Sequence, residues 1–168
     1  MLQFTEATEN DVDSLLDIYN YYLLNSTAVF DDDAIDMTEF RNRVPVGHGR
    51  SKAFCVIVDG EQAGFCFLSQ YRNKRAYDRT AEIGLYLKPP FTGRGYGAEI
   101  VRHLETAAKA SGFDMLVASV SGENLPSIRV FQKLGYSQCA HYRGIAVKFG
   151  RKQDILDFQK PVNGLSLV

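Results

Sequence analysis

Residues 80–101 read TAEIGLYLKPPFTGRGYGAEIV, and this stretch decides the fold. Its first part, Thr80–Leu87, is rich in residues that favour strands and stops at two prolines. A glycine-rich loop, residues 92–97, follows, and apolar residues then recur at helical spacing over residues 100–108. Backbone N–H groups at the start of such a helix, with no Cβ atoms in the way, are suited to holding the phosphates of a ligand.

Three kinds of phosphate site use a loop of this type. A Walker loop ends in Gly-Lys-Ser/Thr, whereas Gly97 is followed by Ala98 and Glu99, which argues against nucleotide triphosphate hydrolysis. A dinucleotide fold places its loop in the first unit of alternating strands and helices, whereas this loop lies in mid-chain after an expected hairpin. Two interpretations of the loop remain: the pyrophosphate loop of a coenzyme A enzyme, and a tight turn that binds no ligand.

Strands and helices are expected on both sides of the loop. Before it, the pattern predicts a strand near Leu2–Thr5, a helix with Thr8 as N-cap and apolar positions from Val12 to Leu23, a weaker helix from Thr38 through Arg43, and strands Ala53–Val58 and Gln62–Gln70 around an Asp59-Gly60 turn. After it, the pattern predicts a helix ending at Gly112, a strand Met115–Val120, a helix from Pro126 to near Gly135, and strands Ser137–Lys148 and Asp154–Lys160.

Length and composition indicate one globular domain over residues 1–168. Hydrophobic residues make up 45% and charged residues 23%, which excludes a disordered or fibrous chain. The 19 basic and 20 acidic residues give a net charge of −1, so no global field favours nucleic acid or an anionic membrane as a partner. There is no long apolar run and the N-terminus is polar, so we expect a cytoplasmic protein.

The cysteines and histidines give no sign of a metal site or an acyl-enzyme nucleophile. Cys55, Cys66 and Cys139 are an odd set with no close pair, and we expect them to be buried and reduced. The three histidines lack the spacing of metal ligands, so no metal is expected. They are His48, His103 and His141.

Several motifs in this order resemble the GCN5-related N-acetyltransferases, the GNAT superfamily, whose acetyl-CoA loop follows the fourth strand with the pattern Gln/Arg-x-x-Gly-x-Gly/Ala. Arg94, Gly95 and Gly97 fit that pattern, while Thr92 stands where Gln or Arg is usual. The next family motif is matched by Asn124, Ser127 and the stretch Phe131-Gln132-Lys133-Leu134-Gly135-Tyr136. The resemblance implies an α/β fold with a mixed, mostly antiparallel sheet of about seven strands and about four helices.

Within the superfamily the chain resembles the phosphinothricin, methionine sulfoximine and L-amino-acid N-acetyltransferase branch. The segments that carry this likeness are Ile18-Tyr19-Asn20, Arg72-Asn73-Lys74-Arg75-Ala76-Tyr77, Thr80-Ala81-Glu82, and Lys148-Phe149-Gly150-Arg151 with Asp154. Lys74 and Lys152 stand where that branch more often has Arg and Trp. The resemblance also implies a homodimer with substrate pockets near its interface.

The same resemblance assigns a catalytic base and a coenzyme site. Glu82, between Ala81 and Ile83, corresponds to the family's base on the fourth strand, and these apolar neighbours are expected to raise its pKa. The alternative is a glutamate on an exposed strand face. The residues that the resemblance implies for acetyl-CoA are Leu85, Tyr86 and Leu87 through their backbone, and Gly93, Arg94, Gly95, Tyr96, Gly97, Ala98, Asn124 and Lys133.

Two of these coenzyme residues have a structural alternative. Lys133 is equally consistent with a solvated helix surface, and Asn124 with a helix cap, which does not exclude coenzyme binding. Phe131 stands where many relatives have a tyrosine that protonates the leaving thiolate, so we expect catalysis without a dedicated acid there, and Tyr136 is expected to be core.

The expected amine substrate is small and anionic. A basic cluster near the base suits a carboxylate or phosphinate, because Arg offers paired N–H donors, although a solvated hairpin end is the alternative. The substrate-binding residues are expected to be Arg72, Asn73, Lys74, Tyr77 and Glu82. The expected reaction is direct acetylation of an α-amino group. The alternatives are an acetyltransferase for a protein N-terminus, an antibiotic or a polyamine, and a non-catalytic coenzyme A sensor.

Overall fold

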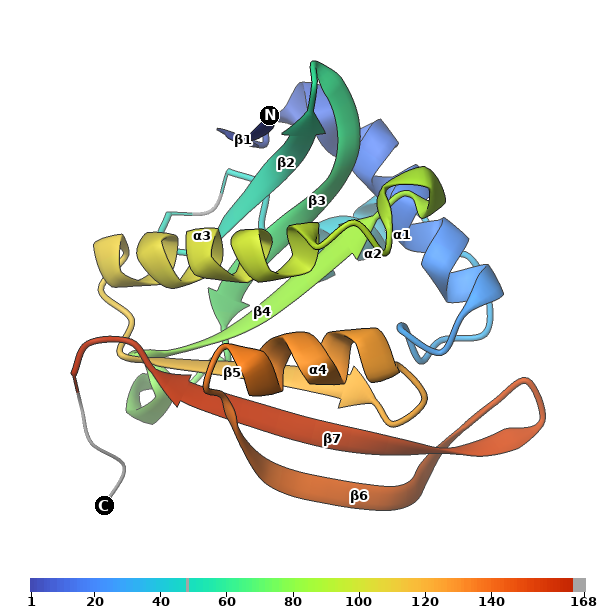
Figure 1. The fold of residues 1–168 in the computed structure, drawn as a ribbon. Helices are drawn as coiled ribbons and strands as arrows, with labels where there is room; N and C mark the ends of the chain where they lie inside the picture. The colour runs from blue at the N-terminus through green and yellow to red at the C-terminus, as the bar shows by residue number, and fades with distance from the viewer. Residues whose placement is uncertain (48, 165–168) are drawn as a thin grey trace.

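The computed structural model describes residues 1–47 and 49–164, which form one seven-stranded sheet with four helices (Figure 1). The sheet order is β1-β2-β3-β4-β5-β7-β6. The strands are β1 Leu2–Glu6, β2 Lys52–Val58, β3 Glu61–Gln70, β4 Thr80–Leu87, β5 Met115–Ser121, β6 Ser137–Lys148 and β7 Arg151–Pro161. The helices are α1 Val12–Asn25, α2 Met37–Arg43, α3 Tyr96–Ala110 and α4 Leu125–Lys133, with short 3₁₀ turns at Glu9–Asp11, Arg75–Tyr77 and Pro89–Phe91.

The sheet is mixed and mostly antiparallel, which confirms the expected fold. Its parallel pair is β4 with β5, and their pairing covers Thr80–Glu82 against Met115–Val117. Beyond Glu82 the two strands diverge, while β4 stays paired to β3 as far as Leu87. The C-terminal half of β4 therefore has a free edge on the side of β5.

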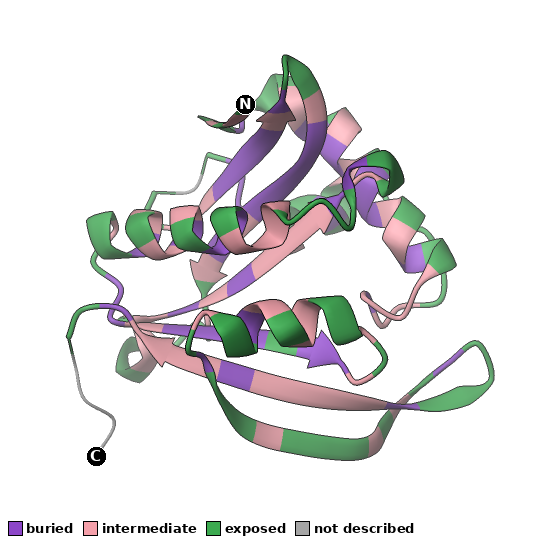
Figure 2. Ribbon diagram, viewed as in Figure 1, coloured by how far each residue is buried: buried purple, intermediate pink, exposed green. Residues whose placement is uncertain are grey.

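Helices cover the sheet from both sides. In Figure 1 α3 and α4 lie in front of the sheet, whereas α1 and α2 lie behind it. The core in front joins Ile100 and Leu104 of α3 to strand residues such as Leu68 and Leu116, and the core behind joins Leu15 and Phe40 to β2 and β3. Figure 2 shows the buried residues concentrated in the central strands, between these two layers.

Local signals explain most element boundaries. Asp59 and Gly60 both have positive φ, 51° and 86°, as a two-residue hairpin turn requires. Thr8 and Asp11 form the capping box of a 3₁₀ turn that leads into α1. Helix α2 begins at Met37, one residue before the expected start, because the Asp36 side chain accepts a hydrogen bond from the Glu39 N–H at 2.8 Å.

Two expectations about the C-terminal half are wrong. Strand β7 begins at Arg151, not Asp154, because Phe149 and Gly150 make a tight turn with φ of 51° and 69°. The sequence gives no signal for this turn at Phe149, because phenylalanine rarely adopts the left-handed region. Cys55 and Cys66 are buried as expected, but Cys139 is exposed because it lies at an irregularity of the outermost strand, β6.

The described part of the chain lacks two further features. Within residues 1–47 and 49–164 no helix is long and apolar enough to cross a membrane. In the same ranges no three His, Cys, Asp or Glu side chains are grouped as metal ligands. His48, one of the three histidines considered above, lies outside the described residues.

Candidate active site

A cavity of about 580 Å³ opens where β4 and β5 diverge. Its walls come from the end of β4, the glycine-rich loop, α4 and the C-terminal end of α1. The lining residues are Tyr22, Ala28, Leu85, Tyr86, Leu87, Phe91, Thr92, Gly93, Gly95, Tyr96, Gly97, Asn124, Pro126, Ser127, Val130 and Phe131. Most residues assigned to the coenzyme from the sequence therefore border one space.

The glycine-rich loop presents unobstructed backbone to this cavity. Gly93 and Gly95 have φ of 72° and 86°, a region that other residues rarely adopt. Helix α3 begins at Tyr96 directly after Gly95, with no side-chain cap among the described residues. A Cβ atom on Gly97 would lie 3.4 Å from a methyl group of Val130, an ordinary contact distance, so α3 and α4 pack closely at this point. Free N–H groups and the positive helix end fit an anionic phosphate group.

Glu82 lies in a second, smaller cavity of about 110 Å³. This cavity shares Leu85, Tyr86 and Phe131 with the larger one, so the two are contiguous through the gap between β4 and β5. Burial raises the pKa of Glu82, and the nearby carboxylate of Asp157 raises it further. The expected direction of its pKa is confirmed, with Asp157 as a cause that the sequence did not indicate.

Aromatic packing shapes the wall beside Glu82. A Cβ atom on Gly84 would lie 2.5 Å from the ring of Phe67, so glycine is required for that ring to cross β4. Phe67, Ser119 and Ser121 line the smaller cavity, and Tyr22 and Ala28 line the larger one. Sequence reasoning missed all five, because none stands in a motif and strand divergence alone brings them together.

Phe131 is buried at the junction of the two cavities. Its ring packs against Tyr136 and Phe158 with centroid distances of 5.0 Å and 5.8 Å. Tyr136 is likewise buried, which confirms it as core. Phe131 has no ionisable group, so this position provides no general acid.

Three residues assigned to the coenzyme do not line either cavity: Arg94, Ala98 and Lys133. Arg94 is exposed and its guanidinium lies 5.7 Å from the ring centroid of Phe91. Lys133 is the exposed last residue of α4. Asn124 does line both cavities, and its side chain also caps α4 by accepting from the Ser127 N–H at 3.2 Å.

The basic cluster occupies the loop between β3 and β4. Arg72, Asn73, Lys74 and Arg75 are exposed, and Tyr77 is half-buried. The Arg72 guanidinium lies 5.1 Å from the ring centroid of Tyr71 and 5.7 Å from that of Tyr77. Tyr71, then Tyr77, raises the pKa of Arg72, and Tyr142 of β6 adds a smaller effect in the same direction. Arg72 therefore packs over Tyr71 and Tyr77 and lines neither cavity.

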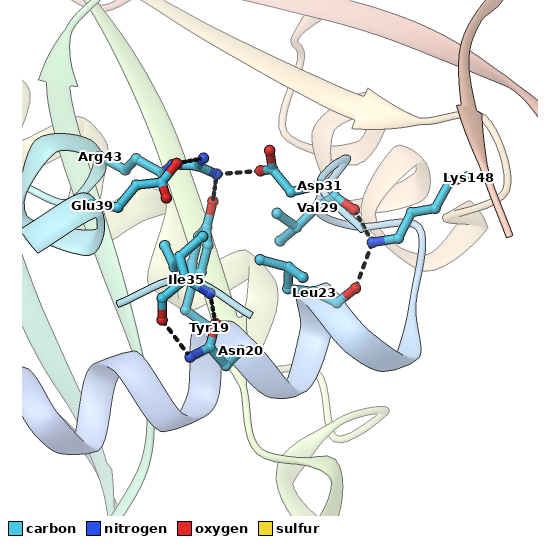
Figure 3. Close-up of polar contacts among 9 residues, drawn as sticks. All are labelled: Tyr19, Asn20, Leu23, Val29, Asp31, Ile35, Glu39, Arg43 and Lys148. Carbon is cyan, nitrogen blue, oxygen red and sulfur yellow. Dashed lines mark hydrogen bonds and ion pairs between the residues drawn. The ribbon is translucent and has the colours of Figure 1, made fainter. Parts of the chain in front are cut away.

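A buried lysine secures the segment after α1 that borders the cavities (Figure 3). Lys148 of β6 is 1% exposed, and its ammonium donates hydrogen bonds to the carbonyls of Leu23, at 2.6 Å, and Val29. Burial lowers its pKa, while Asp32 and Asp31 oppose that shift. Because Ala28 lines both cavities, the β6–β7 hairpin is tied directly to the site.

The same segment is fixed at its other end by side chains of α1 and α2. Asn20 exchanges two hydrogen bonds of 3.0 Å with the backbone of Ile35. Arg43 pairs with Asp31 and Glu39 and donates to the Tyr19 hydroxyl at 3.3 Å (Figure 3). The segment from Ser26 to Asp36 thus has fixed anchors although it contains no helix or strand.

Comparison with known protein families identifies the family to which this fold belongs. The profile of the acetyltransferase (GNAT) family matches residues 15–136, which is more than half of the chain. The chain belongs to the GNAT acetyltransferase family. This GNAT domain is an N-acetyltransferase, and its seven-stranded mixed sheet with four helices matches GNAT structures.

Individual relatives of the GNAT chain align nearly end to end. A phosphinothricin N-acetyltransferase of Streptomyces coelicolor is 27% identical, over 96% of each chain. An L-methionine sulfoximine/L-methionine sulfone acetyltransferase of Salmonella typhimurium is also 27% identical, over 91% of this chain and 90% of its own. A GNAT phosphinothricin acetyltransferase structure from Sinorhizobium meliloti, in complex with acetyl-CoA, is 25% identical with a TM-score of 0.88, over 95% and 88% of the two chains.

The anchor provided by Lys148 predicts a stability effect in this GNAT domain. We expect Lys148→Met to lower the free energy of unfolding by about 1–3 kcal/mol, because the Leu23 and Val29 carbonyls would lose their buried donor. Lys152→Met, at an exposed position of the same hairpin, should stay within about 0.5 kcal/mol of the wild type. Urea unfolding measures both, and equal stability of the two variants would show that Lys148 does not anchor the segment.

Proposed function

We propose that this protein transfers the acetyl group of acetyl-CoA to the α-amino group of a small amino acid or of a glutamate-like analogue such as phosphinothricin or methionine sulfoximine. The observation that carries the proposal is the continuity of the two cavities, with a glycine cradle in one and Glu82 in the other. The names of the two relatives and the acetyl-CoA in the Sinorhizobium meliloti structure support it.

The coenzyme would lie in the larger cavity. Bound there, acetyl-CoA supplies its acetyl group as a thioester. In this proposal the backbone N–H groups of residues 93–98 hold the pyrophosphate at the start of α3. The free edge of β4 at residues 85–87 binds the pantetheine arm and the thioester carbonyl. Asn124 borders the arm, and Arg94 and Lys133, both exposed, contact outer phosphates.

Glu82 would prepare the amine for attack. An aliphatic amine is protonated at neutral pH, so the Glu82 carboxylate first accepts one proton, directly or through a water molecule. The neutral nitrogen then attacks the thioester carbonyl and forms the new C–N bond, the C–S bond breaks, and the second proton of the nitrogen passes through solvent to the departing thiolate, which becomes the free thiol of coenzyme A. Because Phe131 has no proton to donate, the thiolate leaves without a dedicated acid at that position.

Residues 72–77 would orient the amino acid. In this proposal the guanidinium of Arg72 binds the α-carboxylate through paired N–H donors. Asn73 and Lys74, exposed on the same loop, add donors, and Tyr77 lines the pocket from its half-buried position. A carboxylate beside the amine is thus the feature that separates the proposed acceptors from simple amines.

Glu82→Gln tests the base. We expect turnover to fall at least about a hundredfold, because the amide cannot accept the amine proton, while acetyl-CoA affinity changes less than about twofold. In the wild type, the acidic limb of kcat/KM should lie above the ordinary carboxylate pKa of 4.5, since burial and Asp157 raise the pKa of Glu82. Steady-state kinetics across pH and calorimetry with acetyl-CoA measure these quantities, and undiminished turnover would exclude Glu82 as base.

Matched acceptors test recognition of the carboxylate. We expect L-methionine to be acetylated at least about tenfold more efficiently than 3-methylthiopropylamine, which lacks only the carboxylate, and Arg72→Ala to remove that difference. Release of free thiol from acetyl-CoA measures both rates. A preference for polyamines, aminoglycosides or peptide N-termini would replace the proposed substrate class with another amine, and acetyl-CoA binding without turnover on any amine would indicate a sensor.

A homodimer is also proposed, through the β6–β7 hairpin, which extends away from the body of the molecule (Figure 1). It exposes several apolar side chains, including Ile145 at 58% and Val147 at 62%. We expect light scattering to give about twice the chain mass of 18.8 kDa for the wild type and the monomer mass for Val147→Asp. A monomeric wild type at micromolar concentration would contradict the dimer.

A further inference from the structure

A row of polar side chains lies beside Glu82, on the face of the sheet from which Glu82 projects. Glu82 of β4 lies opposite Val117 of β5, and Ser119, two residues along, lies opposite Asp157 of β7. Because paired residues and residues two apart share a face, the side chains of Glu82, Ser119 and Asp157 all project from one side of the sheet. Ser119 also lines the cavity that contains Glu82.

Asp157 is held in place but not neutralised. The Ser119 hydroxyl donates to its Oδ1 at 2.6 Å, and the carboxylate is half-exposed. No cation pairs with Asp157 within residues 1–47 and 49–164, in contrast to Asp154, which contacts His141 at 2.8 Å, and Asp114, which pairs with Arg79. An oriented carboxylate that is hydrogen-bonded to a residue of the cavity wall and has free acceptor capacity is suited to a cationic group of a ligand.

The cationic loop and this carboxylate both interact electrostatically with Tyr142 of β6. The charge of Asp157 is the largest cause of a raised pKa at Tyr142, and Tyr71 contributes to it as well. Tyr142 in turn acts on Arg72. Tyr142 thus lies within electrostatic range of both, and neither Arg72 nor Asp157 is engaged in an ion pair in the part of the chain that the structure describes. The face of the sheet beside Glu82 therefore carries the carboxylate of Asp157, and the exposed cation of Arg72 lies within electrostatic range of the same tyrosine.

We propose that Asp157, oriented by Ser119, binds the side chain of the acceptor and selects α-amino acids whose side chain ends in a cation. With the α-carboxylate at Arg72 and the amino group at Glu82, the side chain crosses β5 towards Asp157. This inference rests on the proposed transfer of an acetyl group to an α-amino group, and it makes a basic amino acid, rather than a glutamate-like analogue, the preferred acceptor. A basic amino acid such as arginine matches all three groups, whereas an anionic side chain such as that of phosphinothricin meets the charge of Asp157.

Asp157→Asn tests this assignment with a matched pair of acceptors. L-Arginine and L-citrulline have nearly the same shape, but citrulline is neutral at the end of its side chain. We expect the wild type to have a kcat/KM for arginine at least about tenfold above that for citrulline, mainly through KM, and Asp157→Asn to bring the ratio close to one. Asp17→Asn, an equal change of charge at an exposed position of α1, should leave the ratio unchanged.

Two further measurements make the result independent of folding and of the proposed function. Ser119→Ala, which keeps the carboxylate but removes its donor, should give an intermediate ratio, and thermal melts identify any variant that is unfolded. If Asp157→Asn does not fold, the order of kcat/KM for arginine, citrulline and glutamate in the wild type tests the role of Asp157.

A ratio unaffected by Asp157→Asn, or a wild type that prefers glutamate or phosphinothricin to arginine, would overturn the role of Asp157 while leaving α-amino acid acetylation intact. Failure to acetylate any α-amino acid would overturn the proposed function and this inference with it.

Discussion

The divergence of β4 from β5 is the constraint on which the site depends. The strands pair over Thr80–Glu82 and Met115–Val117, which fixes Glu82 on rigid sheet, and they separate immediately afterwards. The separation frees one edge of β4 and opens a path between the two faces of the sheet. Parallel pairing over three residues is weak by itself, so the long antiparallel contacts of β4 with β3 and of β5 with β7 hold the geometry.

Other features of the chain serve this opening. Glycine at position 84 allows the Phe67 ring to lie across β4, and glycines at 93 and 95 turn the chain so that α3 starts towards the cavity. On the opposite side, Lys148 brings the carbonyls of Leu23 and Val29 together, which sets the segment that borders both cavities. Long-range polar contacts therefore position the part of the wall that has no secondary structure.

Charge is distributed in a way that the total of −1 conceals. The glycine-rich loop borders one cavity, Glu82 and Asp157 place two carboxylates on one face of the sheet, and the exposed loop at residues 72–75 carries three cations. A near-neutral chain can thus carry local fields of either sign. The sequence predicted two small anionic ligands, coenzyme A and an anionic amine substrate, for the glycine-rich loop and for Arg72. Asp157 is proposed to add a negative subsite, which the sequence did not predict.

Prediction from the sequence succeeded where a local pattern has one physical solution. The Asp59-Gly60 turn, the amphipathic helices and the strand–loop–helix order follow from periodicity and backbone preference. It failed where the answer depends on tertiary neighbours. Ser119 and Asp157 are 38 residues apart and meet only through the register of β5 and β7. Cys139 is exposed because β6 is an outer strand, and nothing near it in sequence indicates that position.

The most direct test of the central claim is a crystal structure with coenzyme A and an α-amino acid acceptor. The coenzyme sulfur should lie in the gap between β4 and β5, and the acceptor nitrogen should lie within about 3.2 Å of the Glu82 carboxylate or one water molecule away. A coenzyme bound outside that gap, or an acceptor nitrogen with no path to Glu82, would contradict it.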